Sequence, residues 1–277
     1  MEVIFGGITS IFYGTGDFLG GEGAKRAPAA SIVFWAGVVS LPIMTTVALL
    51  VGGEASSGDF ALGAAAGISG SFGLVFLFAG LGRGHAAAVA PVSAAMAAIV
   101  PVLVVVIIDG ERPSALAWLG VAVAVPAIIL CAWVADPGDT PGGGFLFGLA
   151  AGVGFGGFTA IIRLTSPESN LLPLIASRGA STATVLLIAL AGAWRLVGFR
   201  SVPRPVVVGS GVLDVAGNVT LLLALRAGSV ALAAVAASFY PVVTVMLARL
   251  VNAEHLRGRQ LAGVGLALFA IVAIALG

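Results

Sequence analysis

Two ionisable residues stand inside apolar sequence, where charged side chains are rare. Asp214 lies near the centre of the segment GVLDVAGNVTLLLAL, and Asn218 follows it four residues later. Residues four apart share one face of a helix, so this carboxylate and amide could together hydrogen-bond an amine or a hydroxyl of a substrate. Arg178 lies in a second apolar segment, and its planar guanidinium suits a substrate carboxylate. A zwitterion such as an amino acid would need both poles, which Arg178 and Asp214 offer.

Structural roles are equally open for these three residues. An ionisable side chain in hydrocarbon costs about 2.5–3.5 kcal/mol on insertion scales, so it normally faces a cavity or a partner. Asp214 and Asn218 could satisfy the backbone of a neighbouring helix, or Asp214 could pair with Arg178. Arg178 could also extend towards the membrane interface. The sequence favours the Arg178–Asp214 pair and leaves substrate or proton binding by Asp214 open.

Asp17 is a further candidate for carrying a coupling proton, beside Asp214. It lies about five residues before the predicted end of the first apolar segment, a rise of about 7.5 Å, so a solvated helix end is the plainer interpretation. In partial hydrocarbon, however, desolvation favours the protonated form of a carboxyl group. Proton coupling by Asp17 is therefore the alternative hypothesis.

Three aromatic residues within apolar segments could contact a substrate: Tyr13, Trp35 and Tyr240. Their rings can stack on a ligand while a polar tip forms a hydrogen bond, although most such rings only pack or sit at membrane interfaces. Tyr240 is the best candidate of the three because it directly precedes a proline, which frees a backbone carbonyl and allows a bend.

Prolines within apolar segments mark possible hinges at Pro91, Pro101 and Pro241. Irregular backbone is tolerated in membranes where it lines a cavity, so the fourth and ninth segments are predicted to form cavity walls. Glycines at spacing four, such as Gly63 with Gly67 and Gly148 with Gly152, predict closely packed helices.

The composition fixes the kind of elements that must position these residues. The chain has 60% hydrophobic and 9% charged residues and a mean hydropathy of +1.16, whereas a soluble domain carries roughly 25% charged residues. A membrane helix needs roughly 20 apolar residues, and we identify ten such stretches. We expect an all-α, polytopic membrane protein with no signal peptide, because the N-terminal segment lacks a basic leader. The predicted spans are 3–22, 30–52, 60–82, 86–108, 114–134, 144–164, 171–193, 206–226, 229–250 and 260–277.

The two halves of the chain share a pattern at a constant offset. Arg83, Glu111 and Gly120 are each followed by the same residue type 143 positions later, at equivalent places in the second half. Five crossings per half would invert the second copy in the membrane, as in many secondary transporters. The predicted parts are a first repeat at 1–134, a linker at 135–143 and a second repeat at 144–277.

Basic residues give an orientation, since Lys and Arg favour the cytoplasmic side in short loops. The connections after odd-numbered spans, with their helix ends, hold nine of these residues and the opposite side holds three, which predicts that both termini face outward. The nine are Lys25, Arg26, Arg83, Arg195, Arg200, Arg204, Arg249, Arg257 and Arg259, and the three are Arg112, Arg163 and Arg226.

Residues 228–274, with Pro241, Glu254, Gln260 and Gly263, resemble the closing half of the repeat in EamA-type transporters of the drug/metabolite transporter superfamily. The matching run in the first half and the motif YGTGDFLGG at 13–21 extend this resemblance over nearly the whole chain. Ala117 departs from it, since a counterpart of Gln260 is missing. The resemblance implies a ten-helix bundle that exports or exchanges a small metabolite by alternating access, usually driven by a gradient.

Other function classes lack their residues. The only two histidines, His85 and His255, stand at span ends without a metal-ligand spacing, and Cys131 has no base nearby in sequence, so no enzyme, metal or cofactor is predicted. A net charge of +1 without a basic cluster argues against nucleic acid. The predicted partners are a small-molecule substrate and the lipid bilayer of the cell membrane, with a monomer as the expected state. A structural or lipid-interacting membrane protein without transport activity is the alternative.

Overall fold

The computed structural model describes residues 1–104, 106–107, 114–132, 143–227, 239–252 and 258–276. Within these ranges the chain forms ten α-helices and two short 3-10 helices, and no strand. The α-helices are α1 (Glu2–Ala24), α2 (Ala29–Val51), α3 (Ser57–Leu81), α4 (Ala86–Val104), α5 (Ala115–Ala132), α6 (Gly143–Ile162), α7 (Leu172–Leu190), α8 (Arg204–Ala227), α10 (Tyr240–Asn252) and α11 (Gly258–Leu276). The 3-10 helices are η2 (Pro167–Ser169) and η3 (Phe199–Ser201).

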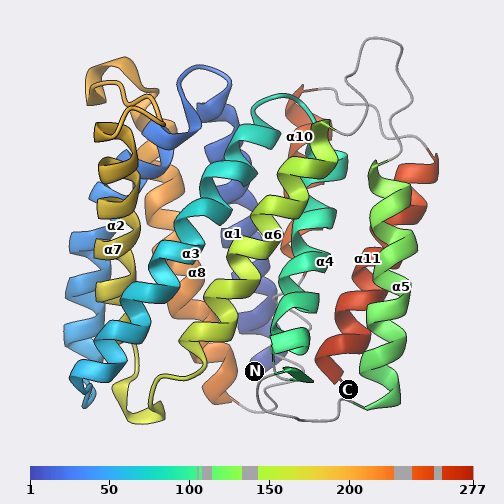
Figure 1. Cartoon of the computed structure of the whole chain (residues 1–277), viewed down its shortest axis with the longest axis horizontal. Coiled ribbons are helices and arrows are strands. Elements are labelled where there is room, and N and C mark those ends of the chain that lie inside the picture. Colours follow the sequence, from blue (N-terminus) through green and yellow to red (C-terminus); the bar gives the residue numbers. More distant parts are fainter. Residues whose placement is uncertain (105, 108–113, 133–142, 228–238, 253–257, 277) are drawn as a thin grey trace.

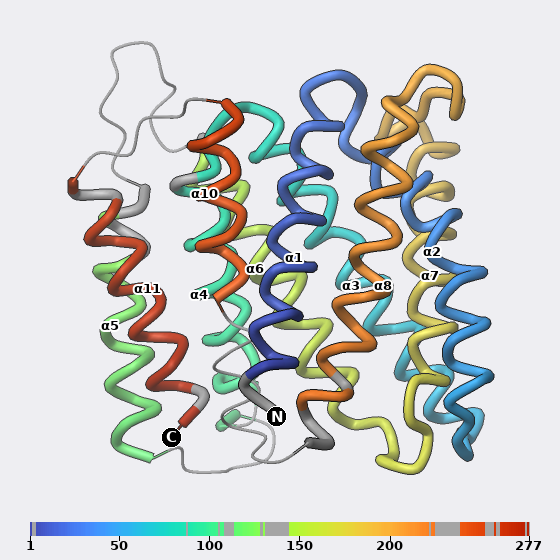
Figure 2. The backbone as a smooth tube through the Cα atoms, turned by 180° about the vertical axis from the view of Figure 1, so that it is seen from behind, coloured from blue at the N-terminus to red at the C-terminus, as the bar shows by residue number. Residues whose placement is uncertain are grey.

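The helices stand side by side in one bundle, and both termini lie at the same end (Figure 1). α2 and α7 lie at one edge of the bundle and α5 and α11 at the other, with α1, α8 and α10 on the face that Figure 2 shows. Helices at equivalent places in the two halves run in opposite directions: α1 rises in Figure 1 where α6 descends, and α3 rises where α8 descends. Their contacts are also reciprocal, because α1 packs on α8 and α6 packs on α3.

Large apolar side chains cover the outside of the bundle. Leu50, Leu187 and Leu250 are 81%, 64% and 75% exposed, whereas the small polar residue Thr9 is fully buried. Such a surface suits lipid rather than water. Among the described residues, four helices are long and apolar enough to cross a membrane: Ala29–Val51, Ser57–Leu81, Gly144–Ile162 and Leu172–Leu190.

Glycines let the helices approach closely, as their spacing predicts. A Cβ atom on Gly67 of α3 would overlap the backbone of Ser177 on α7. On α6, a Cβ on Gly152 would overlap the side chain of Met96 on α4. These contacts make α3 and α6 central helices, each packed on two or more neighbours.

The predicted helix boundaries can be compared with the structure over the described residues. α1 continues to Ala24 rather than ending at residue 22, and α4 is described as far as Val104, with residues 105 and 108 of the predicted fourth span outside the described ranges. The described part of the ninth predicted span, 229–250, is only α10, since residues 228–238 lie outside the described ranges. The predicted linker 135–143 also lies outside them except for Gly143, the first residue of α6.

Candidate functional site

A narrow polar cavity lies between α1, α2, α3, α7 and α8, about midway along these helices. Its empty space is about 490 Å³, the open mouth included. Val33, Leu74 and Phe78 form apolar parts of the wall. The polar side chains that line it are Tyr13, Asp17, Ser40, Arg178, Ser181, Thr182, Ser210 and Asp214.

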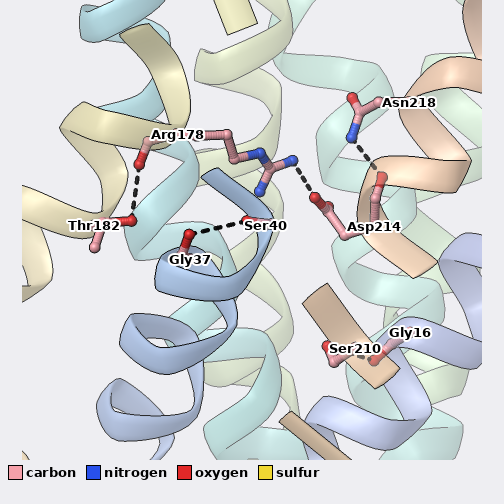
Figure 3. A network of polar contacts seen from close by, with 8 residues as sticks. All are labelled: Gly16, Gly37, Ser40, Arg178, Thr182, Ser210, Asp214 and Asn218. Atoms are coloured by element: carbon pink, nitrogen blue, oxygen red, sulfur yellow. Dashed lines mark hydrogen bonds and ion pairs between the residues drawn. The ribbon is translucent and has the colours of Figure 1, made fainter. Parts of the chain in front are cut away.

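The expected Arg178–Asp214 ion pair is present and joins α7 to α8 (Figure 3). Nη2 of Arg178 lies 2.5 Å from Oδ2 of Asp214, and the two side chains are 15% and 25% exposed. Among the described residues, Nε of Arg178 is buried and has no hydrogen-bond partner. The guanidinium lines the cavity while one of its N–H groups stays buried.

Asp17 brings a second carboxylate to the same cavity. It lies seven residues before the end of α1, so it lines the cavity instead of standing at a solvated helix end. Asp214 interacts with it electrostatically, yet Asp17 has no hydrogen bond or ion pair within the described part of the chain. With both carboxylates ionised, the cavity carries two negative charges against one positive charge. Such a surplus favours a proton or a cationic group.

The two tyrosines belong to neighbouring helices, Tyr13 to α1 and Tyr240 to α10. Tyr13 lines the cavity, and its ring packs on α8 at Gly217, where an added Cβ would lie 2.5 Å from Cε1 of the ring. Tyr240 opens α10 and interacts electrostatically with Asp17. Oγ1 of Thr244 donates to the backbone carbonyl of Gly14 at 3.1 Å, which fixes α10 against α1.

Two predicted binding residues lie away from the cavity lining. Nε1 of Trp35 donates to the carbonyl of Val197 at 2.9 Å, and its ring packs against Phe199 at a centroid distance of 5.1 Å. Nδ2 of Asn218 donates to the carbonyl of Asp214 at 2.7 Å within α8. In this structure both side chains support backbone instead of facing the cavity.

The predicted hinge prolines are built into helices. Pro91 and Pro101 lie inside α4, and Pro91 is fully buried. Pro241 is the second residue of α10 and is also fully buried. A hinge role for these residues stays a prediction.

The hydroxyl groups of the cavity were not predicted from the sequence. Thr182 lies four residues after Arg178, and Ser210 lies four residues before Asp214, so each occupies the same helix face as its charged neighbour. Oγ of Ser210 donates to the carbonyl of Gly16 at 3.1 Å, which joins α8 to α1. This spacing around each charge is the signal that could have identified them. The described residues contain no cluster of His, Cys, Asp and Glu that could hold a metal ion.

At the end of the bundle that holds the termini, Asp59 ties the two halves together. Its Oδ1 accepts from the backbone N–H of Ser166 at 2.7 Å, and its Oδ2 accepts from Ser56 N–H at 2.8 Å and Ser56 Oγ–H at 2.7 Å. The N–H of Glu54 donates to the carbonyl of Glu168 at 2.9 Å nearby. The connection between α2 and α3 is thus joined to that between α6 and α7.

A second tie lies at the opposite end. Oγ of Ser31, at the start of α2, accepts from the N–H of Val197 at 3.0 Å and donates to the carbonyl of Arg195 at 3.3 Å. Together with the bond from Trp35, this joins α2 to the connection between α7 and α8. Each end of the bundle is therefore held by a few hydrogen bonds between the halves.

Comparison with known proteins gives a family for the whole chain. The model of the EamA-like transporter family matches residues 1–133 and 142–276. The comparison with curated proteins gave no match. Among solved structures, one described only as "Crystal structure of protein" is similar with a TM-score of 0.60 and 19% identity, over 98% of this chain and 95% of that chain. At that identity the likeness shows the fold alone.

Proposed function

Because the chain belongs to the EamA-like transporter family of the drug/metabolite transporter superfamily and is therefore a multi-pass membrane transporter, we propose that its cavity carries a small polar metabolite. The observation that carries this proposal is the unpaired carboxylate of Asp17 beside the Arg178–Asp214 pair. A zwitterion such as an amino acid fits this arrangement. Its ammonium group would meet the surplus negative charge, and its carboxylate would meet the guanidinium of Arg178, which lines the cavity.

The same surplus charge supports coupling to protons. A proton on Asp17 would balance the charge of the empty cavity, and a bound ammonium group would replace it. Cargo and proton would then occupy the site in turn, which is the requirement for export or exchange driven by a proton gradient. Asp214 is the second carboxylate that could take part in this exchange. When cargo binds Arg178, the ion pair between Arg178 and Asp214 would weaken, and Asp214 could then accept a proton.

Alternating access is supported by the arrangement of the two halves. The opposite directions of equivalent helices and the reciprocal contacts of α1 with α8 and α6 with α3 support inverted five-helix repeats around the cavity. The ties at Asp59 and at Ser31 lie at opposite ends of the bundle, so each can open while the other holds. We propose bending at Pro91 and Pro101 of α4 and at Pro241 of α10 during this change. The basic end would face the cytoplasm, with both termini outside.

Transport by purified protein in proteoliposomes tests the proposal. Uptake and counterflow would be measured over a panel of labelled amino acids and metabolites, with and without a pH gradient. The variants are Asp214→Asn and Asp17→Asn, and Glu54→Gln is the matched control, since Glu54 is exposed in a connection away from the cavity. We expect saturable transport of a zwitterion that Asp214→Asn abolishes and Glu54→Gln leaves intact. Well-folded protein that moves no cargo would refute the proposed cargo class, and equal loss in all three variants would refute the site.

A further inference from the structure

A second, apolar groove lies between α3 and α6, outside the polar cavity. Its empty space is about 1130 Å³, open side included. Leu146 and Val153 on α6 are 63% and 49% exposed along it. The two helices lie side by side in Figure 1, at the face opposite the one that Figure 2 shows. The lining residues are Ser69, Phe72, Phe76, Leu146, Phe147, Leu149, Ala150, Val153 and Gly154.

The groove offers no free polar group to a water-soluble ligand. Its one hydroxyl belongs to Ser69, which donates to the carbonyl of Gly154 at 2.9 Å. All its other side chains are apolar. An occupant must therefore be a hydrocarbon chain. The apolar surface around the groove faces the bilayer, whose lipids provide such chains.

The cationic side chain of Arg83 lies at one end of this groove. The guanidinium of Arg83 lies over the ring of Phe147, with Cζ 4.6 Å from the ring centroid. The side chain of Arg83 is exposed, and its bond to a carbonyl, that of Ala79 at 2.6 Å, lies within its own helix end. Phe72 packs edge-on against Trp194 at 5.5 Å, and the exposed Arg195 follows directly. Indole rings and basic residues are the groups that proteins place at the level of lipid headgroups.

We propose that this groove binds an anionic phospholipid, with an acyl chain along α3 and α6 and its phosphate against Arg83. Charge complementarity selects this occupant, because a zwitterionic lipid would bring its own cation to the same end. A second copy of the chain would bring a further Arg83 towards the face, which argues against self-association here. The proposal does not depend on the cargo of the polar cavity.

Lipid titration of the full chain followed by native mass spectrometry tests the proposal. Phosphatidylglycerol and phosphatidylcholine with identical acyl chains would be compared on the wild type, Arg83→Gln, Ala150→Phe and Arg26→Gln. Arg26 is exposed at the same end of the bundle, after α1, and serves as the matched control. Thermal melting would confirm that each variant is folded.

We expect the wild type to retain phosphatidylglycerol preferentially. Arg83→Gln should weaken that retention about fivefold, the ratio expected for one basic residue near an anionic headgroup, while Arg26→Gln leaves it unchanged. Ala150→Phe should fill the groove and displace both lipids. Equal retention of the two lipids by the wild type, or an unchanged preference in Arg83→Gln, would overturn the proposal. A dimer that Ala150→Phe dissociates would assign the groove to a second copy instead.

Discussion

Breaking the Arg178–Asp214 ion pair should destabilise the protein by an amount that a double-mutant cycle can isolate. The variants are Asp214→Asn, Arg178→Gln and the combination of both. Each single change removes one member of the ion pair, whereas the double change removes both. The comparison therefore separates the pair itself from the effect of each substitution.

The expected magnitude follows from the burial of the two side chains. Two unit charges about 4 Å apart attract by about 4 kcal/mol at an effective permittivity of about 20, and desolvation cancels part of this. Removing one partner of a fully buried pair costs about 3–5 kcal/mol. Since Arg178 and Asp214 keep 15% and 25% exposure, water screens the remaining charge, and we expect about 2–3 kcal/mol for each single variant. The coupling energy should be about 2 kcal/mol.

The assay is equilibrium unfolding of the four proteins in one detergent, followed by tryptophan fluorescence. We expect the double variant to be more stable than the sum of the single losses predicts, because neither member of the ion pair is left without the other. A coupling energy below about 0.5 kcal/mol would refute the reasoning, since the two charges would then be independently solvated. Transport by the same proteins shows whether the double variant, which no longer holds half of an ion pair, still lacks activity, as a substrate-binding pair requires.

Three further changes test other parts of the structure. Asp17→Asn removes an unpaired carboxylate from the cavity, so it should raise the unfolding free energy by on the order of 1 kcal/mol, and a lower stability would contradict this. The same change should abolish the response of transport to a pH gradient while counterflow persists. Gly67→Ala should cost about 1–3 kcal/mol in thermal unfolding because the methyl group overlaps the α7 backbone, whereas Gly265→Ala, with open space around it, should not destabilise. Asp59→Asn should open the tie between the halves, so a cysteine introduced at Ser40 should react faster with an impermeant thiol reagent; an unchanged rate would exclude Asp59 from closure.

The sequence predicted the helices and the charged pair because both depend on a strong local contrast. Twenty apolar residues in a row have few alternatives to a membrane helix, and a charge inside such a run must find a partner. The position of Asp17 was harder to predict. The sequence placed the end of the first helix at residue 22, but α1 continues to Ala24, so Asp17 lies further from the helix end and lines the cavity. Trp35 could not be placed from local sequence, because its partner is the backbone of Val197, which is 162 residues away. Hydroxyls such as Thr182 are common in membrane helices, so only their spacing from a charge sets them apart.

The two halves share a scaffold but differ in their chemistry. At the offset of 143 residues, Trp35 corresponds to Arg178 and Ser71 to Asp214, so the first half has neither charge of the ion pair. Trp35 donates to a connection and Ser71 donates to the carbonyl of Ile68 within its own helix, so these positions support structure in the first half.

The same contrast separates the polar cavity from the apolar groove. α1 against α8 and α6 against α3 are equivalent helix pairs, yet the first borders a cavity with two carboxylates and the second a groove lined by Phe72, Phe76 and Phe147. Equivalent helix pairs can in this way differ in polarity, with polar side chains in the proposed cargo pathway and aromatic side chains in the proposed lipid groove. It follows that a carboxylate placed in this groove away from Arg83, as in Val153→Asp, should lower the thermal unfolding temperature without creating transport, because no cation such as Arg178 lines the groove there.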